Sequence, residues 1–127
     1  MASIRKVNTR PELALRRGLW RHGVRGWRCH VRTVPGTPDL VFARWRVAIH
    51  VDGVWWHGHP DYLPAGRRGP YWDRKIARNR ERDRVVDAAL RQQGWISLRV
   101  WDLDVLRDLG ATVALVVSTL RSRGWER

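Results

Sequence analysis

The chain has 127 residues and a mass of 14.9 kDa, and its 25 basic against 12 acidic side chains give a formal charge of +13. With 43% hydrophobic residues it can bury a core, so we expect one domain over 1–127, flexible only at 1–7 and 124–127. A single cysteine excludes an internal disulfide framework. No apolar run approaches the ~20 residues that cross a bilayer, so we expect a cytoplasmic protein with no membrane partner.

The positive charge indicates a polyanionic partner. Basic side chains that contact phosphates release counterions, so nucleic acid is the leading candidate. A GC-rich genome would explain why Arg far outnumbers Lys, but not why bases outnumber acids.

The first predicted element is a helix that begins at Thr9, where Thr9 and Glu12 have the spacing of a capping box, and that ends near Gly23. Strand, loop, strand, turn and strand are then predicted over residues 27–32, 33–38, 39–42, 43–46 and 47–51.

Residues 53–70 are too rich in Gly and Pro for a helix, and long irregular segments of this kind are usually functional or disordered. A long helix over 71–93, a strand over 95–101 and a closing helix through 109–120 complete the chain. This order predicts an α/β domain with a central mixed sheet flanked by helices.

Two carboxylates lie at the boundaries of predicted strands. Asp39 lies where a loop enters a strand, and Asp52 lies where the next strand ends. Carboxylates at neighbouring strand ends can share a hard divalent cation together with substrate phosphate. Asp beside Pro or Gly is also ordinary turn chemistry, so the spacing alone leaves both interpretations open.

The segment 54–59 combines two tryptophans with two histidines. An imidazole such as His57 can take a proton from an attacking water, although loop histidines often do no more than form hydrogen bonds. Trp55 and Trp56 are candidates either for core packing or for stacking on and wedging between bases.

The helix over 71–93 has a basic side and an inner stripe. Lys75, Arg78 and Arg82 can contact phosphates, whereas Asn79 and Asp83 lie on the inner face and need polar partners there.

Six segments in the same order and at matching spacing resemble the very-short-patch repair (Vsr) DNA mismatch endonucleases. They are Thr9-Arg-Pro-Glu12, Pro35-Gly-Thr-Pro-Asp39-Leu-Val-Phe, Val51-Asp-Gly-Val-Trp-Trp-His-Gly-His59, Tyr71-Trp-Asp-Arg-Lys-Ile, Asn79-Arg-Glu-Arg-Asp83 and Gly94-Trp, and Val100-Trp101 follows them. The resemblance spans roughly residues 3–105 and implies the PD-(D/E)XK nuclease-like fold, with the element order α-β-β-β-α-β.

The resemblance also implies roles for individual residues. Asp39 and the backbone carbonyl of Val51 correspond to ligands of a catalytic Mg²⁺, for which Mn²⁺ is the alternative. His57 corresponds to the general base, and Glu12 to an acidic helper on the first helix, a residue that the capping box would also explain. Asp52 stands where the repair enzymes carry His, and it would add a second carboxylate to the metal site.

Further positions correspond to DNA contacts and to a structural zinc. Trp55, Trp56 and Trp72 match the aromatic residues that enter the duplex beside a T:G mismatch, and Lys75 and Asn79 fall near the scissile strand. The zinc positions are Val54, His59, Asp61 and Leu103. Because only His59 is a zinc ligand of the family type, we expect no structural zinc.

These observations predict a Mg²⁺-dependent endonuclease that nicks one strand of double-stranded DNA, beside T:G mismatches left by deamination of 5-methylcytosine. A nuclease of restriction or phage defence, and a non-catalytic DNA-binding module, are the alternatives. We expect a monomer associated with the nucleoid, with a functional link to a cytosine-5 methyltransferase or to repair proteins.

Overall fold

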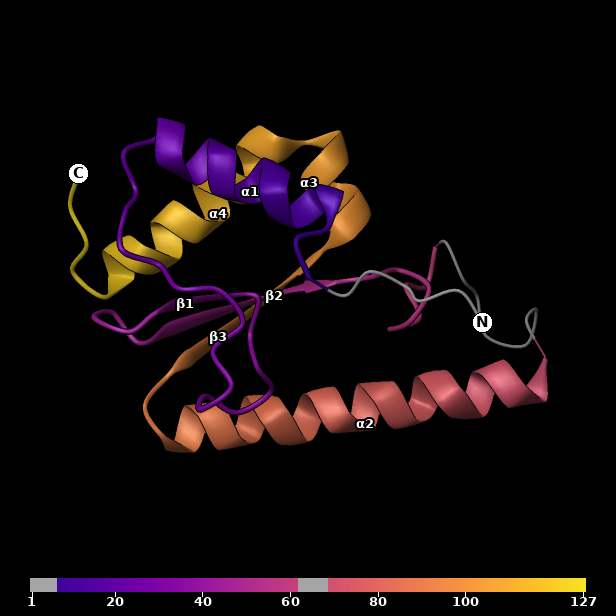
Figure 1. Cartoon of the computed structure of the whole chain (residues 1–127). Helices are drawn as coiled ribbons and strands as arrows, with labels where there is room; N and C mark the ends of the chain where they lie inside the picture. The colour runs from indigo at the N-terminus through magenta and orange to yellow at the C-terminus, as the bar shows by residue number, and fades with distance from the viewer. Residues whose placement is uncertain (1–6, 62–68) are drawn as a thin grey trace.

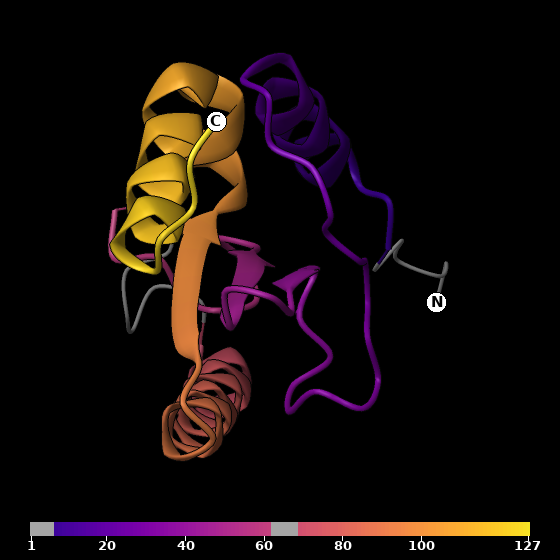
Figure 2. The same ribbon diagram turned by 90° about the vertical axis from the view of Figure 1, so that its left-hand side faces the viewer.

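The computed structural model describes residues 7–61 and 69–127, in which helices cover both faces of a small sheet (Figure 1, Figure 2). The elements are α1 (Arg10–Arg21), β1 (Leu40–Phe42), β2 (Val47–Asp52), α2 (Pro70–Gln92), β3 (Ile96–Trp101), α3 (Asp102–Arg107) and α4 (Leu109–Ser122). Helices α1, α3 and α4 lie on one face, and α2 runs along the other. The predicted α/β class is thereby confirmed. Within the described ranges, no helix is long and apolar enough to span a membrane.

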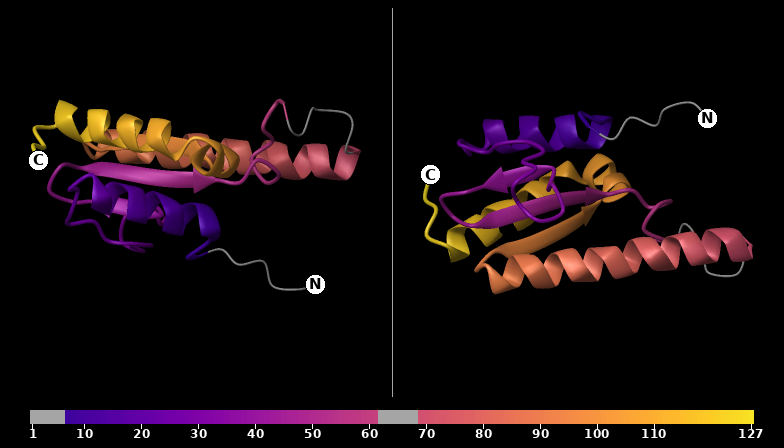
Figure 3. Two further views of the ribbon diagram at one scale, coloured as in Figure 1. Left: turned by 90° about the horizontal axis from the view of Figure 1, so that it is seen from above. Right: turned by 60° about the horizontal axis from the view of Figure 1, so that its bottom comes forward.

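The sheet has β2 in its centre. Strand β1 pairs with β2 in the antiparallel sense and β3 pairs with β2 in the parallel sense, so Ile49 lies between Leu40 and Leu98. Parallel pairing brings the carboxyl ends of β2 and β3 to the same edge, beside the loop that follows β2 (Figure 3). Side chains at this edge therefore come from segments far apart in the sequence.

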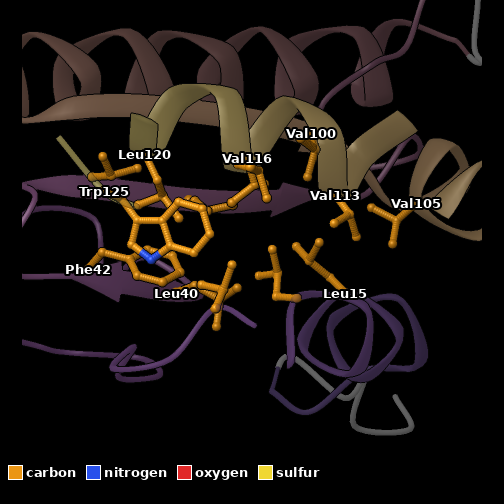
Figure 4. Packing of buried hydrophobic residues seen from close by; sticks show 14 residues of the cluster. Leu15, Leu40, Phe42, Val100, Val105, Val113, Val116, Leu120 and Trp125 are labelled. Carbon is orange, nitrogen blue, oxygen red and sulfur yellow. The ribbon is translucent and has the colours of Figure 1, made fainter. Parts of the chain in front are cut away.

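The two faces of the sheet differ in chemistry because side chains alternate along each strand. Val47, Ile49 and Val100 face the apolar core, where Leu15 and Leu19 of α1 pack against them and against α4 (Figure 4). The alternate positions His50, Asp52, Ser97 and Arg99 form hydrogen bonds among themselves or with α2. One face thus builds the core, and the other carries polar groups.

Several predicted details differ in the structure. Residues 27–32 form no strand: Arg28 alone bridges to Val41, and a left-handed backbone at His30 (φ 53°) ends the extended run. Thr9 makes no side-chain cap, so the capping box does not form. Trp125 lies in the tail that was expected to be flexible, yet it is buried against the core, while residues 1–6 lie outside the described ranges. Helix α3 was not predicted.

A substitution in the apolar core tests this packing directly. Leu15 is fully buried, so Leu15→Ala leaves a cavity and is expected to lower the free energy of unfolding by about 2–5 kcal/mol. The matched control is Leu115→Ala on α4, where the side chain is 46% exposed and a change within about 0.5 kcal/mol is expected. Urea unfolding followed by circular dichroism measures both; equal losses would contradict the assigned core.

Candidate active site

Asp39 is fixed by the loop that precedes it. Gly36 has φ 79° and lies so close to α2 that a Cβ there would be 2.4 Å from Val86 Cγ1, so a larger residue would push the loop away. At the end of this loop Asp39 Oδ2 accepts a hydrogen bond from the backbone N–H of Val51 at 2.6 Å. The carboxylate is thereby held beside the end of β2.

Asp39 belongs to a group of three ligand-bearing residues, Glu12, His30 and Asp39, here called the Asp39 cluster. His30 Nε2 lies 3.0 Å from Glu12 Oε2 and 3.6 Å from Asp39 Oδ1. Glu12 is buried, and it also accepts hydrogen bonds from the backbone N–H of Asn8 and from Arg16 Nη2, both at 3.1 Å. Glu12 therefore contacts both the residue before the N-cap of its own helix and His30 of the site.

The Asp39 cluster has the electrostatics of a cation site. Burial raises the pKa of Asp39 to about 6, and the charge of Glu12 adds to this rise, while the Val51 N–H and His30 oppose it. Two carboxylates and an imidazole have ligand atoms within 4.8 Å of one another. A divalent cation would relieve the repulsion between the acids, so this donor set fits a hard metal ion.

A second group, Asp52, His57 and Asp83, is called the His57 cluster. His57 Nδ1 lies 2.5 Å from Asp83 Oδ2, and His57 Nε2 lies 3.8 Å from Asp52 Oδ1. The loop that carries His57 is closed by a hydrogen bond from its backbone N–H to the carbonyl of Gly53. Because the carboxylate of Asp83 occupies Nδ1, we assign the proton of the neutral imidazole to that atom, which leaves Nε2 as the basic nitrogen.

Arg99 of β3 supplies the positive charge of the His57 cluster. Its Nη1 lies 3.1 Å from Asp52 Oδ1 and 3.4 Å from Asp83 Oδ1. Its Nε donates to both oxygens of Asp87, at 3.0 and 3.1 Å. Burial raises the pKa of Asp52, although His57 and Arg99 both act against the rise. Since a guanidinium already neutralises this group, it fits a cation less well than the Asp39 cluster does.

The two clusters meet at consecutive residues of β2. Asp39 accepts a hydrogen bond from the backbone N–H of Val51, whereas Asp52 faces His57. The charge of Asp52 contributes to the raised pKa of Asp39. The arrangement brings Glu12 to Asp39 and His57 to Asp52. It gives no support to the expectation that Asp52 and Asp39 share one cation, because Asp52 is bonded to Arg99.

The predicted DNA-contacting residues lie on the loop after β2 and on α2. The rings of Trp56 and Trp72 contact each other at a centroid distance of 5.7 Å and a tilt of 50°, with Lys75 Nζ 5.1 Å from the Trp56 ring. Trp55 is 64% exposed. Asn79 Nδ2 donates to the carbonyl of Trp56 at 2.8 Å and so fixes the loop. Arg78 and Arg82 are exposed on α2.

The four positions that match the family's zinc ligands have other partners. Val54 is buried, and its N–H donates to Asp102 Oδ1 at 3.2 Å. The His59 ring lies edge-on against Trp101 at 4.7 Å, and the N–H of Asp61 donates to His59 Nδ1 at 3.1 Å. Asp102 Oδ1 also accepts from the N–H of Leu103 at 2.8 Å. Apolar burial and hydrogen bonds thus hold the loop, and the expectation of no zinc stays a prediction.

Sequence reasoning left His30, Arg99 and Asp87 out of the site. His30 had the spacing of a strand residue, and nothing local showed its left-handed backbone. Arg99 was one arginine among many in an alternating strand. Asp83 gave a usable signal, since it interrupts the apolar stripe of α2, and its partner is His57.

His50 lies beneath the His57 cluster and makes stability depend on pH. Burial, aided by the charge of Arg99, lowers its pKa to about 4, and its Nε2 lies 3.2 Å from Ser97 Oγ. The unfolded chain, with an ordinary pKa near 6.5, binds the proton first when the pH falls. The contribution of His50 is therefore complete above pH 6.5 and is lost as the pH falls towards 4.

We expect His50→Gln to lose this dependence. The unfolding free energy of the natural protein relative to His50→Gln should fall by about 2–3 kcal/mol between pH 7 and pH 4. The carboxylates whose pKa is raised have the opposite sign, but both proteins contain them, so they cancel in the difference. Denaturant titrations over this range measure it; a constant difference would show that His50 is not buried in its neutral form.

Comparison with known proteins identifies the family of the chain. The family model described as DNA mismatch endonuclease Vsr matches residues 1–63. Type II nicking enzyme V.XorIIP of Xanthomonas oryzae is 44% identical over 117 residues, which cover 90% of this chain and 84% of the relative. Type II nicking enzyme V.NaeI of Lentzea aerocolonigenes is 40% identical, covering 94% and 74%. DNA mismatch endonuclease Vsr of Escherichia coli is 41% identical over 73 residues, covering 55% and 46%.

The relatives are named as type II nicking enzymes and as a DNA mismatch endonuclease, and these names define the class of this chain as DNA endonucleases. Within that class, the chain belongs to the Vsr family.

Proposed function

We propose that this protein is a Mg²⁺-dependent DNA endonuclease that hydrolyses one phosphodiester and so nicks one strand of a duplex. The observation that carries the proposal is the meeting of two different chemistries at the end of β2. A carboxylate cluster suited to a cation contacts Val51, and a histidine held by a carboxylate faces Asp52. Phosphodiester hydrolysis needs both charge stabilisation and a base for water.

The cation would be held by Asp39 and by the backbone carbonyl of Val51, with Glu12 and His30 beside them. A bound Mg²⁺ supplies Lewis-acid polarisation of the phosphate and stabilises the negative charge that develops on it. Glu12 keeps its carboxylate turned towards Asp39 through its bonds to Asn8 and Arg16, so the acidic helper needs no reorganisation.

His57 acts as the general base. Its Nε2 takes a proton from water as the water oxygen bonds to phosphorus, and the bond from phosphorus to the leaving sugar oxygen breaks; that oxygen takes a proton from solvent. Asp83 holds the ring through Nδ1 and stabilises the imidazolium that forms. Beside His57 lies a cavity of about 270 Å³, where Arg80 and Arg84 can attract the phosphate backbone.

The duplex would lie along α2 and the loop after β2. Trp55 is exposed and free to stack, while Trp56 and Trp72 form a preassembled aromatic pair capped by Lys75. Rings in this position can enter a base step, and this costs least where pairing is already weak, as in a T:G mismatch. Arg78 and Arg82 supply phosphate contacts from the same helix.

Asp39→Asn tests the cation site. We expect nicking to fall at least about 100-fold, because the carboxylate that holds the cation is lost, while duplex binding measured by fluorescence anisotropy stays within about threefold. Asp104→Asn, an exposed acid on α3, is the matched control and should nick normally. Full activity in Asp39→Asn would refute the assignment.

His57→Gln tests the base. The nicking rate at neutral pH should fall by about 10²–10⁴-fold, since a positioned base contributes an effect of this size. Single-turnover nicking of a labelled duplex measures the rate in both proteins. A rate in His57→Gln within about threefold of the natural protein would mean that another group accepts the proton.

Substrate choice is tested with end-labelled duplexes that carry each mismatch, 5-methylcytosine or neither, with the two strands followed separately. Preference for T:G supports repair of deaminated 5-methylcytosine, in line with the relative named as a mismatch endonuclease. Preference for modified or intact duplex would favour a role in restriction or defence. Binding without cleavage in Mg²⁺ or Mn²⁺ would indicate a non-catalytic module.

We further propose that residues 1–127 act as a single domain and as a monomer, because a nick needs one active site. A functional link to a cytosine-5 methyltransferase, and association with the nucleoid, follow from the proposed substrate.

A further inference from the structure

Arg99 is surrounded by acids from two other elements. Its guanidinium contacts Asp52 of β2 and Asp83 and Asp87 of α2, at distances between 3.0 and 3.4 Å. Ser97 also donates to Asp87, at 2.7 Å, and this fixes the acid that binds Nε of Arg99. The arginine is about one-fifth exposed, so these contacts are partly shielded from water.

The contact with Asp52 decides which groups can approach His57. Both oxygens of Asp52 lie near Nη1 of Arg99, at 3.1 and 3.2 Å, while Oδ1 lies 3.8 Å from Nε2 of His57. Without a positively charged partner, the carboxylate of Asp52 would draw the proton of the imidazole to Nε2 and accept a hydrogen bond from it. Arg99 offers Asp52 a closer and permanently charged partner.

The contact with Asp83 decides how His57 is held. Asp83 Oδ1 faces Arg99 Nη1 at 3.4 Å, and Oδ2 faces His57 Nδ1. The two oxygens of one carboxylate are thus divided between the arginine and the histidine. The carboxylate cannot rotate without losing one of the two partners.

We propose that Arg99 is a positioning residue of the nicking reaction, which holds Asp52 on its guanidinium and turns Asp83 to Nδ1 of His57, so that Nε2 of His57 faces water. This inference rests on the proposed role of His57 as the base. It also gives Asp52 a role: in this chain it pairs with Arg99, and the cation is left to the Asp39 cluster.

Arg99→Gln and the double variant Asp52→Asn/Arg99→Gln test the inference. The single variant should lower kcat by about 10- to 100-fold, because Asp52 then captures His57, with KM for the duplex within about threefold. The double variant removes the capturing charge and should be at least about fivefold faster than Arg99→Gln. A residue with only a structural role would not be rescued by a second loss of charge.

A measurement without metal or DNA gives an independent readout. In ¹⁵N spectra of the imidazoles, the natural protein should show His57 protonated at Nδ1, and Arg99→Gln should shift the proton towards Nε2.

A second measurement is the Mn²⁺ affinity from calorimetry, which should stay within about threefold of the natural protein in both Arg99→Gln and the double variant. Arg123→Gln is the matched control, since Arg123 donates to the carbonyl of Gly94 outside the site, and it should leave kcat unchanged.

A double variant that is no faster than Arg99→Gln would overturn the inference. A loss of Mn²⁺ affinity in the double variant would also overturn it, because Asp52 would then be a ligand of the metal ion. Should Arg99→Gln not fold, Arg99→Lys takes its place, because it keeps the positive charge without the planar guanidinium. This variant should lower kcat and leave KM and Mn²⁺ affinity unchanged. A lower kcat accompanied by equally weakened duplex and Mn²⁺ binding would overturn the proposal. If His57→Gln nicks normally, the proposed base has failed, whatever the Arg99 variants do.

Discussion

The pairing of one guanidinium with three carboxylates is the interaction that holds the proposed active site together. The sheet face that meets α2 carries His50, Asp52, Ser97 and Arg99, and a polar face beneath a helix needs hydrogen-bond partners for its groups. Arg99 offers five N–H donors in a fixed fork, and acids of β2 and α2 accept them. Removing this charge would leave several acids uncompensated, so Arg99 ties the helix to the sheet beside the proposed active site.

That tie sets α2 in register with the site. Asn79, Asp83 and Asp87 follow at four-residue intervals on one helix face, and each contacts a different part of the structure. Asn79 holds the carbonyl of Trp56, Asp83 holds His57, and Asp87 holds Arg99. The same helix therefore fixes the aromatic loop, the proposed base and the sheet, and Arg78 and Arg82, which are proposed to contact phosphates, are exposed on it.

The division of charge between the two clusters follows from the strand between them. The Asp39 cluster lies on the side of α1 and joins acids whose repulsion a cation would relieve, whereas the His57 cluster lies on the side of α2 and contains its own cation in Arg99. The described segment that follows β2, residues 53–61, is held by Val54, Asn79 and Asp102 through burial and hydrogen bonds. The position of this segment therefore follows from contacts within the chain.

Periodicity and local spacing along the chain predicted the class of fold, the long helix α2, the buried strand β2 and the candidate residues Asp39 and His57, whereas Glu12 became a candidate only through the family resemblance. The motifs of the sequence also indicated the family before any coordinates. The tertiary structure decided the partners of those residues: His30 joins Glu12 and Asp39 through a left-handed backbone, and Arg99 binds acids 12 to 47 residues away in sequence. Such contacts depend on how strands and helices pack together, and no local pattern encodes that.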